Sequence, residues 1–279
     1  MKHAASALTR GGAYQLSSLF ILPMKLPRLC LALIISCFAL GAVARAADTS
    51  NRVYEMRTYI ATPGKTAALL ARFRDHTVRL FEKHGMVNVA YWVPTDAKDG
   101  SADKLVYILA HASRDAAKAS WKSFQADPDW KAAAAASEKD GKILASLESV
   151  YLTPTDFSAP MDAGNGSGKR VFELRTYTAA DGKLGDLDAR FRNHTVALFK
   201  KHGITNLGYF HPVDANKGAA NTLIYFLAYP NRDAATAAWK SFREDAAWTK
   251  ARTESEKNGK LTAKTSSVFL QATDFSKVK

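Results

Sequence analysis

The order of hydrophobic and polar residues predicts short strands and helices in a fixed succession. Residues 52–60 alternate in polarity and are rich in Val, Tyr and Thr, which predicts a β-strand. Residues 65–84 place Leu69 and Phe73 on a helical period, and Gly85 follows where left-handed backbone commonly ends a helix.

The same kind of pattern continues to about residue 152. It predicts strands at 87–93 and 104–110, a helix at 114–125 broken near Pro128, a further helical stretch through KAAAAASEK and a short strand at 150–152. The resulting order, β-α-β-β-α-β, is the ferredoxin-like pattern.

The whole pattern occurs twice. Residues 52–158 align without a gap with residues 170–276, at a constant offset of 118 positions, and roughly half of the positions are identical. Residues 159–169 are rich in Gly, Ser, Pro and Asn, which predicts a flexible linker. The sequence therefore predicts a tandem pair of α+β domains.

A ferredoxin-like unit covers only one face of its sheet with helices, so the other face must be buried elsewhere. Two copies in one chain can pack sheet against sheet and form a closed, pseudo-symmetric α/β barrel. Such a barrel has an interior lumen, which is a natural place for a ligand.

The first 46 residues have the composition of a secretory leader. From Met24 the chain has a short basic start, an apolar run at 29–43 and Ala-Arg-Ala, which predicts cleavage before Ala47 and a start at Met24, with 1–23 as an upstream extension. The run is short for a membrane span, so we expect no integral span after cleavage. The location expected is periplasmic or secreted.

Both cysteines lie in this leader. Cys37 allows a lipoprotein as an alternative, but the apolar residues behind it are unlike the polar start of a lipidated chain. The mature chain then has no thiol, which excludes disulfides, cysteine nucleophiles and thiolate metal sites.

Charge and short motifs exclude several classes of function. The formal net charge is +13, and the leader holds five basic residues and no acidic one, so +8 remains for the rest of the chain. These charges alternate in sign instead of forming the basic stripe of a nucleic-acid-binding protein, so no nucleic acid is expected as a partner. The chain has no G-x-G-x-x-G, P-loop, G-x-S-x-G or H-E-x-x-H sequence.

The phrases FRDHTVRLFEKHG and FRNHTVALFKKHG each carry two histidines. His76 and His84 are eight residues apart, about 12 Å along a helix, so they cannot bind one metal ion, and no metal site is expected. For His84 and His202 we predict a role in capping the helix end. His76 and His194 have either a surface role or a role in binding a ligand.

The first strand of each repeat offers the other candidate site. If its apolar residues pack under the helices, alternation points Glu, Arg and Tyr into the barrel. A buried carboxylate beside a guanidinium must be paired. The pair either joins the two sheets or forms a polar floor for an anionic or carbonyl-bearing ligand. The candidate ligand-binding residues are Glu55, Arg57, Tyr59, Glu173, Arg175 and Tyr177, together with His76 and His194.

These motifs resemble the NIPSNAP family. The stretches YEMRTY…PGK, FRDHTV, KHG, YW and WKSF carry the resemblance, once per repeat over nearly all of the chain after the leader. The family implies a dimeric α/β barrel, which heme-degrading monooxygenases and muconolactone isomerase-like proteins share. No agreed catalytic residues come with the family, so the resemblance implies none here.

The sequence therefore predicts an exported protein that binds a small molecule in the barrel lumen, or that associates with a protein partner or with itself. The alternative is a cofactor-free or heme-dependent oxygenase or isomerase. No cofactor is expected, with heme as an open possibility, and the catalytic residues stay unassigned. The two repeats are not identical at all aromatic and histidine positions. Trp92 aligns with Phe210, and His111 aligns with Tyr229.

Overall fold

The computed structural model describes residues 52–161 and 170–279, which fall within one compact unit. The predicted leader with its cleavage site, and most of the predicted linker, lie outside the described residues. Within the described part of the chain, no helix is both long and apolar enough to cross a membrane.

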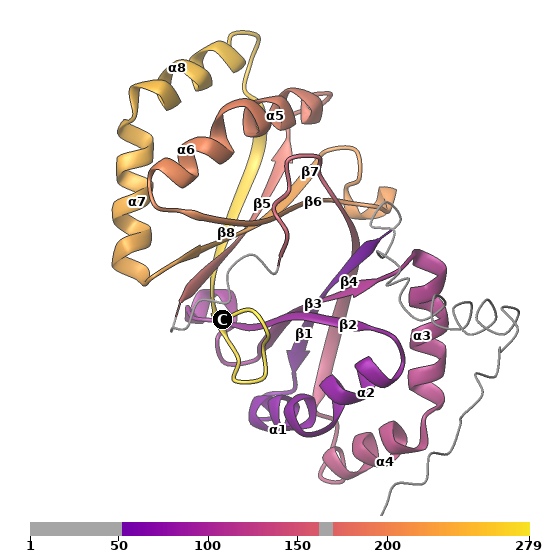
Figure 1. Cartoon of the computed structure of the whole chain (residues 1–279). Coiled ribbons are helices and arrows are strands. Elements are labelled where there is room, and N and C mark those ends of the chain that lie inside the picture. The colour runs from indigo at the N-terminus through magenta and orange to yellow at the C-terminus, as the bar shows by residue number, and fades with distance from the viewer. Residues whose placement is uncertain (1–51, 162–169) are drawn as a thin grey trace, which may run out of the picture. The chain divides into compact units, whose positions relative to one another are not determined.

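Both repeats have the same order of elements, and their helices lie outside the strands (Figure 1). The first repeat contains β1 (Val53–Ala61), α1 (Thr66–Arg72), the π-helical turn η2 (Phe73–Thr77), α2 (Val78–Lys83), β2 (Val87–Pro94), η3 (Ala97–Asp99), β3 (Lys104–His111), α3 (Arg114–Ala126), α4 (Pro128–Ser137) and β4 (Leu144–Pro154). The second contains β5 (Val171–Ala179), α5 (Leu184–Arg190), η4 (Phe191–Thr195), α6 (Val196–Lys201), β6 (Thr205–Pro212), η5 (Ala215–Lys217), β7 (Thr222–Tyr229), α7 (Arg232–Glu244), α8 (Ala246–Ser255) and β8 (Thr262–Ala272).

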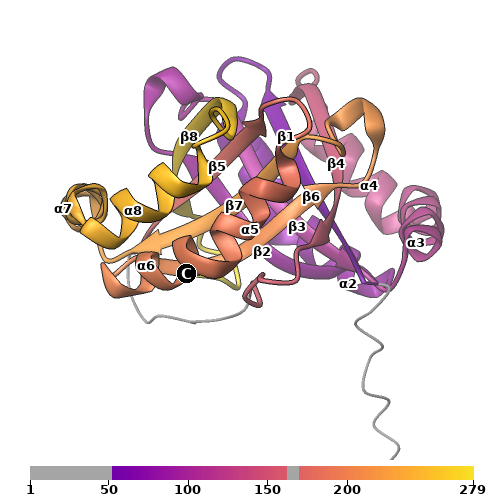
Figure 2. The same cartoon turned by 90° about the horizontal axis from the view of Figure 1, so that it is seen from above.

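The strands form one closed antiparallel barrel, in the order β1-β3-β2-β8-β5-β7-β6-β4. Long ladders hold each repeat together, since β1 pairs with β3 and β4, and β5 pairs with β7 and β8. Two short ladders join the repeats, β4 with β6 and β2 with β8. Seen from above, the helices of the two repeats flank the strands on opposite sides (Figure 2). The predicted fold class is confirmed.

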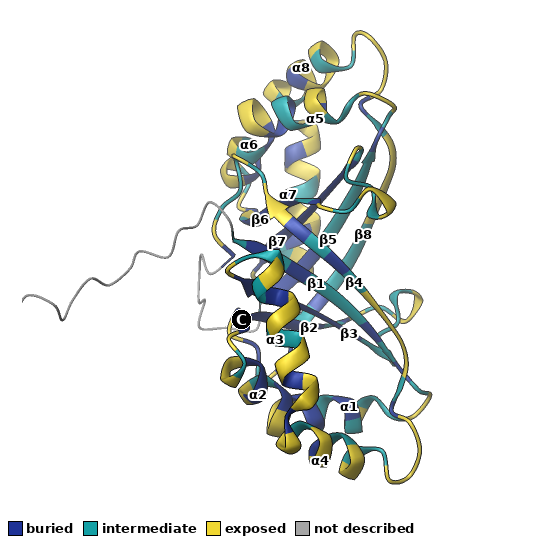
Figure 3. Cartoon of the chain, turned by 90° about the vertical axis from the view of Figure 1, so that its right-hand side faces the viewer, coloured by how far each residue is buried: buried dark blue, intermediate teal, exposed yellow. Residues whose placement is uncertain are grey.

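Apolar side chains of both repeats fill the barrel interior. Trp92 stacks on Phe226 with ring centroids 5.2 Å apart, and Phe172 and Leu270 belong to the same buried cluster. Each repeat has one further apolar cluster, which lies between its strands and its helices. Most strands are accordingly buried or half-buried in the middle of the molecule, while the outer faces of the helices are exposed (Figure 3).

The predicted facing of the first strand is wrong. Tyr54 and Met56 pack against the interior cluster, whereas Tyr59 packs with the helices. Both faces of β1 are covered, one by the opposite sheet and one by helices, so alternation alone does not distinguish them. The apolar residues of β1 face the barrel interior, because apolar side chains of both repeats pack there. The helix side supplies the hydrogen-bond donors that a buried carboxylate requires.

The helix predicted at 65–84 is interrupted by η2, and the strand predicted at 150–152 begins six residues earlier, at Leu144. Most residues in the first half of β4 are exposed, and its apolar and polar residues do not alternate as they do in a half-buried strand. The predicted helix end is confirmed, since Gly85 has a φ of 76°.

The end of each repeat crosses to the other repeat. Phe275 packs on Phe73 and Tyr91, and in the reciprocal contact Phe157 packs on Phe191 and Tyr209. The same tails make ion pairs between repeats, from Arg74 to Asp274 and from Arg192 to Asp156.

Candidate functional site

The Glu, Arg and Tyr side chains of the first strands lie between the barrel and the helices of their own repeat. Glu55 is fully buried and Arg57 is nearly so, with 12% of its side chain exposed. The guanidinium of Arg57 also lies over the ring of Trp121, 4.2 Å from its centroid. The two repeats therefore carry two separate clusters on opposite sides of the barrel, and these clusters do not join the two sheets.

Each carboxylate is surrounded by donors from several elements. Arg57 Nη1 on β1 donates to Glu55 Oε1 at 2.7 Å, and Ser149 Oγ on β4 donates to the same oxygen at 2.6 Å. Trp121 Nε1 on α3 donates to Oε2 at 2.7 Å, and His111 Nε2 lies 3.2 Å from that oxygen. Both oxygens of Glu55 are thus engaged.

Hydrogen bonds keep Glu55 ionised in spite of its burial. Burial alone would raise the pKa of Glu55, but the hydrogen bonds from His111, Ser149 and Trp121 and the charge of Arg57 together lower it from 4.5 to about 2. A carboxylate with so low a pKa, and with both oxygens engaged, is a poor general base at neutral pH.

The second repeat forms the same cluster with one substitution. Arg175 Nη1 and Ser267 Oγ both lie 2.5 Å from Glu173 Oε1, and Trp239 Nε1 donates to Oε2 at 2.9 Å. In place of a histidine, Tyr229 donates to Oε2 at 2.6 Å. Burial and the neighbouring Glu173 raise the pKa of Tyr229 above its ordinary value, so Tyr229 stays a neutral donor.

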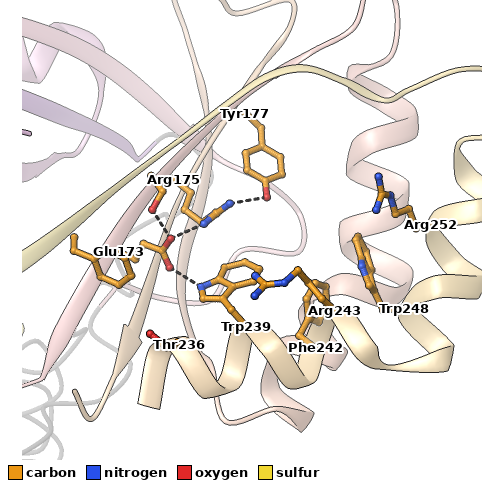
Figure 4. A pocket seen from close by; sticks show the side chains of 11 residues that line it. Glu173, Arg175, Tyr177, Thr236, Trp239, Phe242, Arg243, Trp248 and Arg252 are labelled. Atoms are coloured by element: carbon orange, nitrogen blue, oxygen red, sulfur yellow. Dashed lines mark hydrogen bonds and ion pairs between the residues drawn. The ribbon is translucent and has the colours of Figure 1, made fainter. Parts of the chain in front are cut away.

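A pocket of about 460 Å³ opens beside the cluster of the second repeat, between β5, β8 and helices α7 and α8 (Figure 4). Arg175 forms its inner wall and is fixed by Glu173 and by Tyr225, whose hydroxyl lies 2.9 Å from Nε. Its guanidinium lies over the ring of Trp239, 4.4 Å from the centroid. The lining residues are Glu173, Arg175, Tyr177, Thr236, Trp239, Phe242, Arg243, Trp248, Arg252, Ser267 and Phe269.

Two of the three arginines that line this pocket have no equivalent in the first repeat. At the offset of 118 positions, Arg243 corresponds to Gln125 and Arg252 corresponds to Ala134. Both arginines are exposed at the rim, and Arg252 Nε lies 3.3 Å from Glu256 Oε2. The second repeat therefore has a more positive pocket than its counterpart would have.

The predicted histidine roles are only partly observed. His84 ends α2 as predicted, but its ring lies 2.7 Å from Ser123 Oγ and 2.6 Å from Asp127 Oδ2, so it links α2 to the start of α4 and does not cap carbonyl groups. His202 is placed likewise against Ser241 and Asp245.

His76 and His194 are exposed on η2 and η4, and neither lines the pocket beside the Glu–Arg cluster of the second repeat. His194 lines a separate polar hollow of about 340 Å³ between α5 and α8. In residues 52–161 and 170–279, no group of three or more His, Cys, Asp or Glu side chains is placed to hold a metal ion.

The side chains of the pocket do not fit heme. A heme iron requires an axial ligand such as histidine, thiolate or tyrosinate. The two cysteines belong to the predicted leader, and none of the described histidines lines the pocket. Tyr177 lines it, but its hydroxyl is a hydrogen-bond partner of Arg175 Nη2 at 3.2 Å.

Several residues of the site were not singled out in the sequence. Trp121 and Trp239 are not among the candidate residues named from the sequence, although their indole N–H groups donate to the buried carboxylates. The signal was present in the WKSF phrase, which occurs twice, but the contact spans 66 positions and depends on the tertiary fold. Arg243 was missed because a single exposed arginine on a helix has no pattern of its own.

Two solved structures are similar to this fold over most of the chain. The chain is similar to a monooxygenase candidate from Fusobacterium nucleatum, with 11% identity and a TM-score of 0.53 over 80% of this chain and 92% of that one. It is similar to an anthrone oxidase-like protein, with 12% identity and a TM-score of 0.51 over 82% and 94%. A NIPSNAP domain protein of uncharacterised function from Burkholderia xenovorans is 25% identical, with a TM-score of 0.33, over 38% of this chain and 98% of that one.

No protein of curated function matches the chain in sequence. The NIPSNAP family profile matches it twice, at residues 54–159 and 172–277, which together make up most of its length. The chain is a tandem member of the NIPSNAP family.

Proposed function

We propose that the protein is a binding module for a small anionic ligand with a planar apolar part, held in the pocket of the second repeat. The observation that carries this proposal is the set of three arginines around two tryptophans, of which Arg243 and Arg252 occur in this repeat alone. Export through the leader at residues 1–46 remains part of the proposal.

Different parts of the pocket would bind the flat part and the charged part of the ligand. Trp239 and Arg175 are held by Glu173, so the inner wall is preorganised for a flat ligand. Arg243 and Arg252 supply positive charge at the rim, where a carboxylate or phosphate can accept hydrogen bonds from both guanidinium groups. Its volume is within the usual range for small-molecule sites.

The location differs from the lumen expected from the sequence. The barrel interior carries a cluster of apolar side chains, and the Glu–Arg residues face away from it. The enzyme alternative finds little support in this pocket, because both oxygens of Glu173 are engaged by donors and no other carboxylate or histidine is found among the described residues that line it.

Titration calorimetry with 2-naphthoate and phenyl phosphate tests the proposal, with 2-naphthamide as the uncharged counterpart. We expect the double variant Arg243→Gln/Arg252→Gln to raise Kd for the anions roughly tenfold, equivalent to about 1.4 kcal/mol. Lys250→Gln is the matched control, since Lys250 lies on α8 outside the pocket. Equal binding of naphthoate and naphthamide, or unchanged binding by the double variant, contradicts the proposal. Native mass spectrometry of the purified protein can reveal a co-purifying ligand.

A further inference from the structure

A second cavity lies at one end of the barrel, apart from the pocket of the second repeat. Its volume is about 620 Å³, and its walls come from both repeats and from the two crossing tails. The described lining residues are Arg52, Tyr54, Val87, Asn88, Val89, Pro154, Ser158, Ala159, Pro160, Met161, Phe210, Lys277 and Val278.

The floor of this cavity is apolar and belongs to the barrel core. Val89, Met161, Phe210 and Val278 are members of the buried interior cluster, and Tyr54 packs against it. Tyr54 and Phe210 face each other with ring centroids 5.1 Å apart and tilted planes. Aliphatic and aromatic edges surround the space, and Met161 can adapt to an irregular shape, so the floor fits a flexible alkyl chain better than a flat ring.

The repeats have diverged at the positions that determine whether this space is filled. At the offset of 118 positions, Phe210 corresponds to Trp92 and Val89 corresponds to Leu207. Trp92 and Leu207 are both fully buried and fill the equivalent part of the other half of the barrel. The smaller residue at each of the two positions leaves the cavity open.

Gly208 is a third position at which the repeats differ close to this cavity. Its counterpart is Ala90, and a Cβ at position 208 would collide with the ring of Phe210 and with Met161 Sδ. The glycine therefore allows Phe210 to lie close to its own strand, with Met161 packed beside it. The third difference between the repeats thus lies directly behind two wall residues of the cavity, Phe210 and Met161.

The rim of the cavity is positively charged. Arg52 lies over the ring of Tyr54, 5.5 Å from its centroid, and the described residues provide no carboxylate partner for it. Lys277 is already paired with Glu82 at 2.7 Å. Arg52 is therefore the cation in this rim that is available to an anionic headgroup, with Asn88 and Ser158 as neutral polar neighbours.

We propose that this cavity binds an alkyl monocarboxylate, with its chain on the apolar floor and its carboxylate at Arg52. The ligand and the site differ from those of the second-repeat pocket, so neither proposal depends on the other. The volume is sufficient for a small-molecule ligand, and one available cation beside an apolar floor matches one charged group on an apolar chain.

Titration calorimetry with octanoate tests this, with octan-1-ol as the uncharged counterpart. Phe210→Trp and Val89→Leu, which copy the residues of the other repeat, should each weaken octanoate binding at least tenfold while the melting temperature stays close to that of the unsubstituted protein. Arg52→Gln should weaken octanoate binding severalfold and leave octan-1-ol binding unchanged. Arg79→Gln, on the exposed face of α2, should change neither.

The two proposals are separable. Octanoate binding should persist in Arg243→Gln/Arg252→Gln, and 2-naphthoate binding should persist in Phe210→Trp. If the filling variants fold and still bind octanoate like the unsubstituted protein, the cavity is not its site. Equal loss of octanoate and octan-1-ol in Arg52→Gln overturns the assignment of the carboxylate. If Phe210→Trp does not fold, Val89→Leu tests the same space with a smaller change.

Discussion

At the scale of single residues, each buried carboxylate stabilises the fold by joining four elements of its repeat, three strands and one helix. Glu55 on β1 accepts hydrogen bonds from Ser149 on β4 and Trp121 on α3, and it pairs with Arg57. Removing the charge from Glu55 leaves a buried guanidinium without its counter-ion, which is much more costly than loss of an exposed pair.

We expect Glu55→Gln to lower the free energy of unfolding by about 3 kcal/mol. Glu148→Gln is the matched control, because Glu148 forms an exposed pair with Lys217, and its effect should be no more than about 0.5 kcal/mol. Urea denaturation followed by far-UV circular dichroism measures both values. An effect of Glu55→Gln as small as that of the control would mean that the buried pair contributes little.

The same residue should make stability dependent on pH. The pKa of Glu55 is lowered from 4.5 to about 2 in the folded protein, so its contribution is fully present above about pH 4.5 and is lost as the pH falls toward 2. The difference in stability between the unsubstituted protein and Glu55→Gln should therefore shrink over this range. A difference that stays constant from pH 5 to pH 2 would contradict the low pKa.

Sequence reasoning identified Glu55, Arg57 and Tyr59 as a set, because alternation within a strand is a local property. It could not identify the face, since both faces of β1 are covered and each carries aromatic residues. The donors also come from positions far along the chain, such as Ser149, which is 94 positions from Glu55. Such partners are fixed by sheet register and helix packing, which no local pattern specifies.

At the scale of elements, the ends of the helices were the most predictable features and the long strands were the least. Gly85 and Gly203 both have a φ of 76°, where glycine is strongly favoured. In contrast, β4 and β8 are each 11 residues long, and their first halves are mostly exposed, so apolar and polar residues do not alternate there as they do in a half-buried strand. The π-helical turns were not predicted either, because an extra residue within a helical turn changes the apolar spacing only slightly.

Two glycine substitutions should have opposite effects on stability. Gly85→Ala should destabilise the protein by about 1 kcal/mol, because alanine disfavours left-handed backbone. Steric overlap adds nothing to this cost, since the atom nearest to the added Cβ is Ser120 Oγ at 3.7 Å. Gly185→Ala should stabilise it by about 0.5 kcal/mol, since Gly185 lies in α5 and nothing lies within 4 Å of the added Cβ.

The first repeat already has Ala67 at the position that corresponds to Gly185, so Gly185→Ala introduces the residue of the first repeat. Thermal unfolding of the two variants side by side gives the comparison. If both substitutions shift the melting temperature in the same direction, backbone conformation does not govern the change in stability at one of the two sites.

At the scale of the whole molecule, the two repeats complete one another. The interior cluster takes residues from both, and the short ladders of β4 with β6 and β2 with β8 close the barrel. Arg114 pairs with Asp214 and, reciprocally, Arg232 pairs with Asp96 across the boundary between the repeats. A single repeat would therefore expose one face of its sheet and the edges that form these ladders.

We expect neither residues 52–161 nor residues 170–279 to be a folded monomer when expressed alone. Each half should be unfolded or should form a homodimer, whose second copy replaces the missing repeat. When the halves are mixed after refolding together, a one-to-one complex should form, because Met161, Phe157 and the divergent wall residues fit the opposite repeat. Light scattering after size exclusion gives the stoichiometry, and circular dichroism gives the folded fraction.

The outcome also bears on why the chain is a tandem repeat. A homodimer would bring two identical halves together, so Phe210 or Trp92 would appear on both sides of the barrel, and so would Gly208 or Ala90. Only the tandem chain combines Val89 and Phe210, which leave the cavity open, with Trp92 and Leu207, which fill the equivalent space of the other repeat. If a half proves to be a stable monomer with cooperative unfolding, the barrel interior is not what holds the repeats together. If the homodimer of the first half binds octanoate as well as the full chain does, divergence between the repeats is not needed for the cavity.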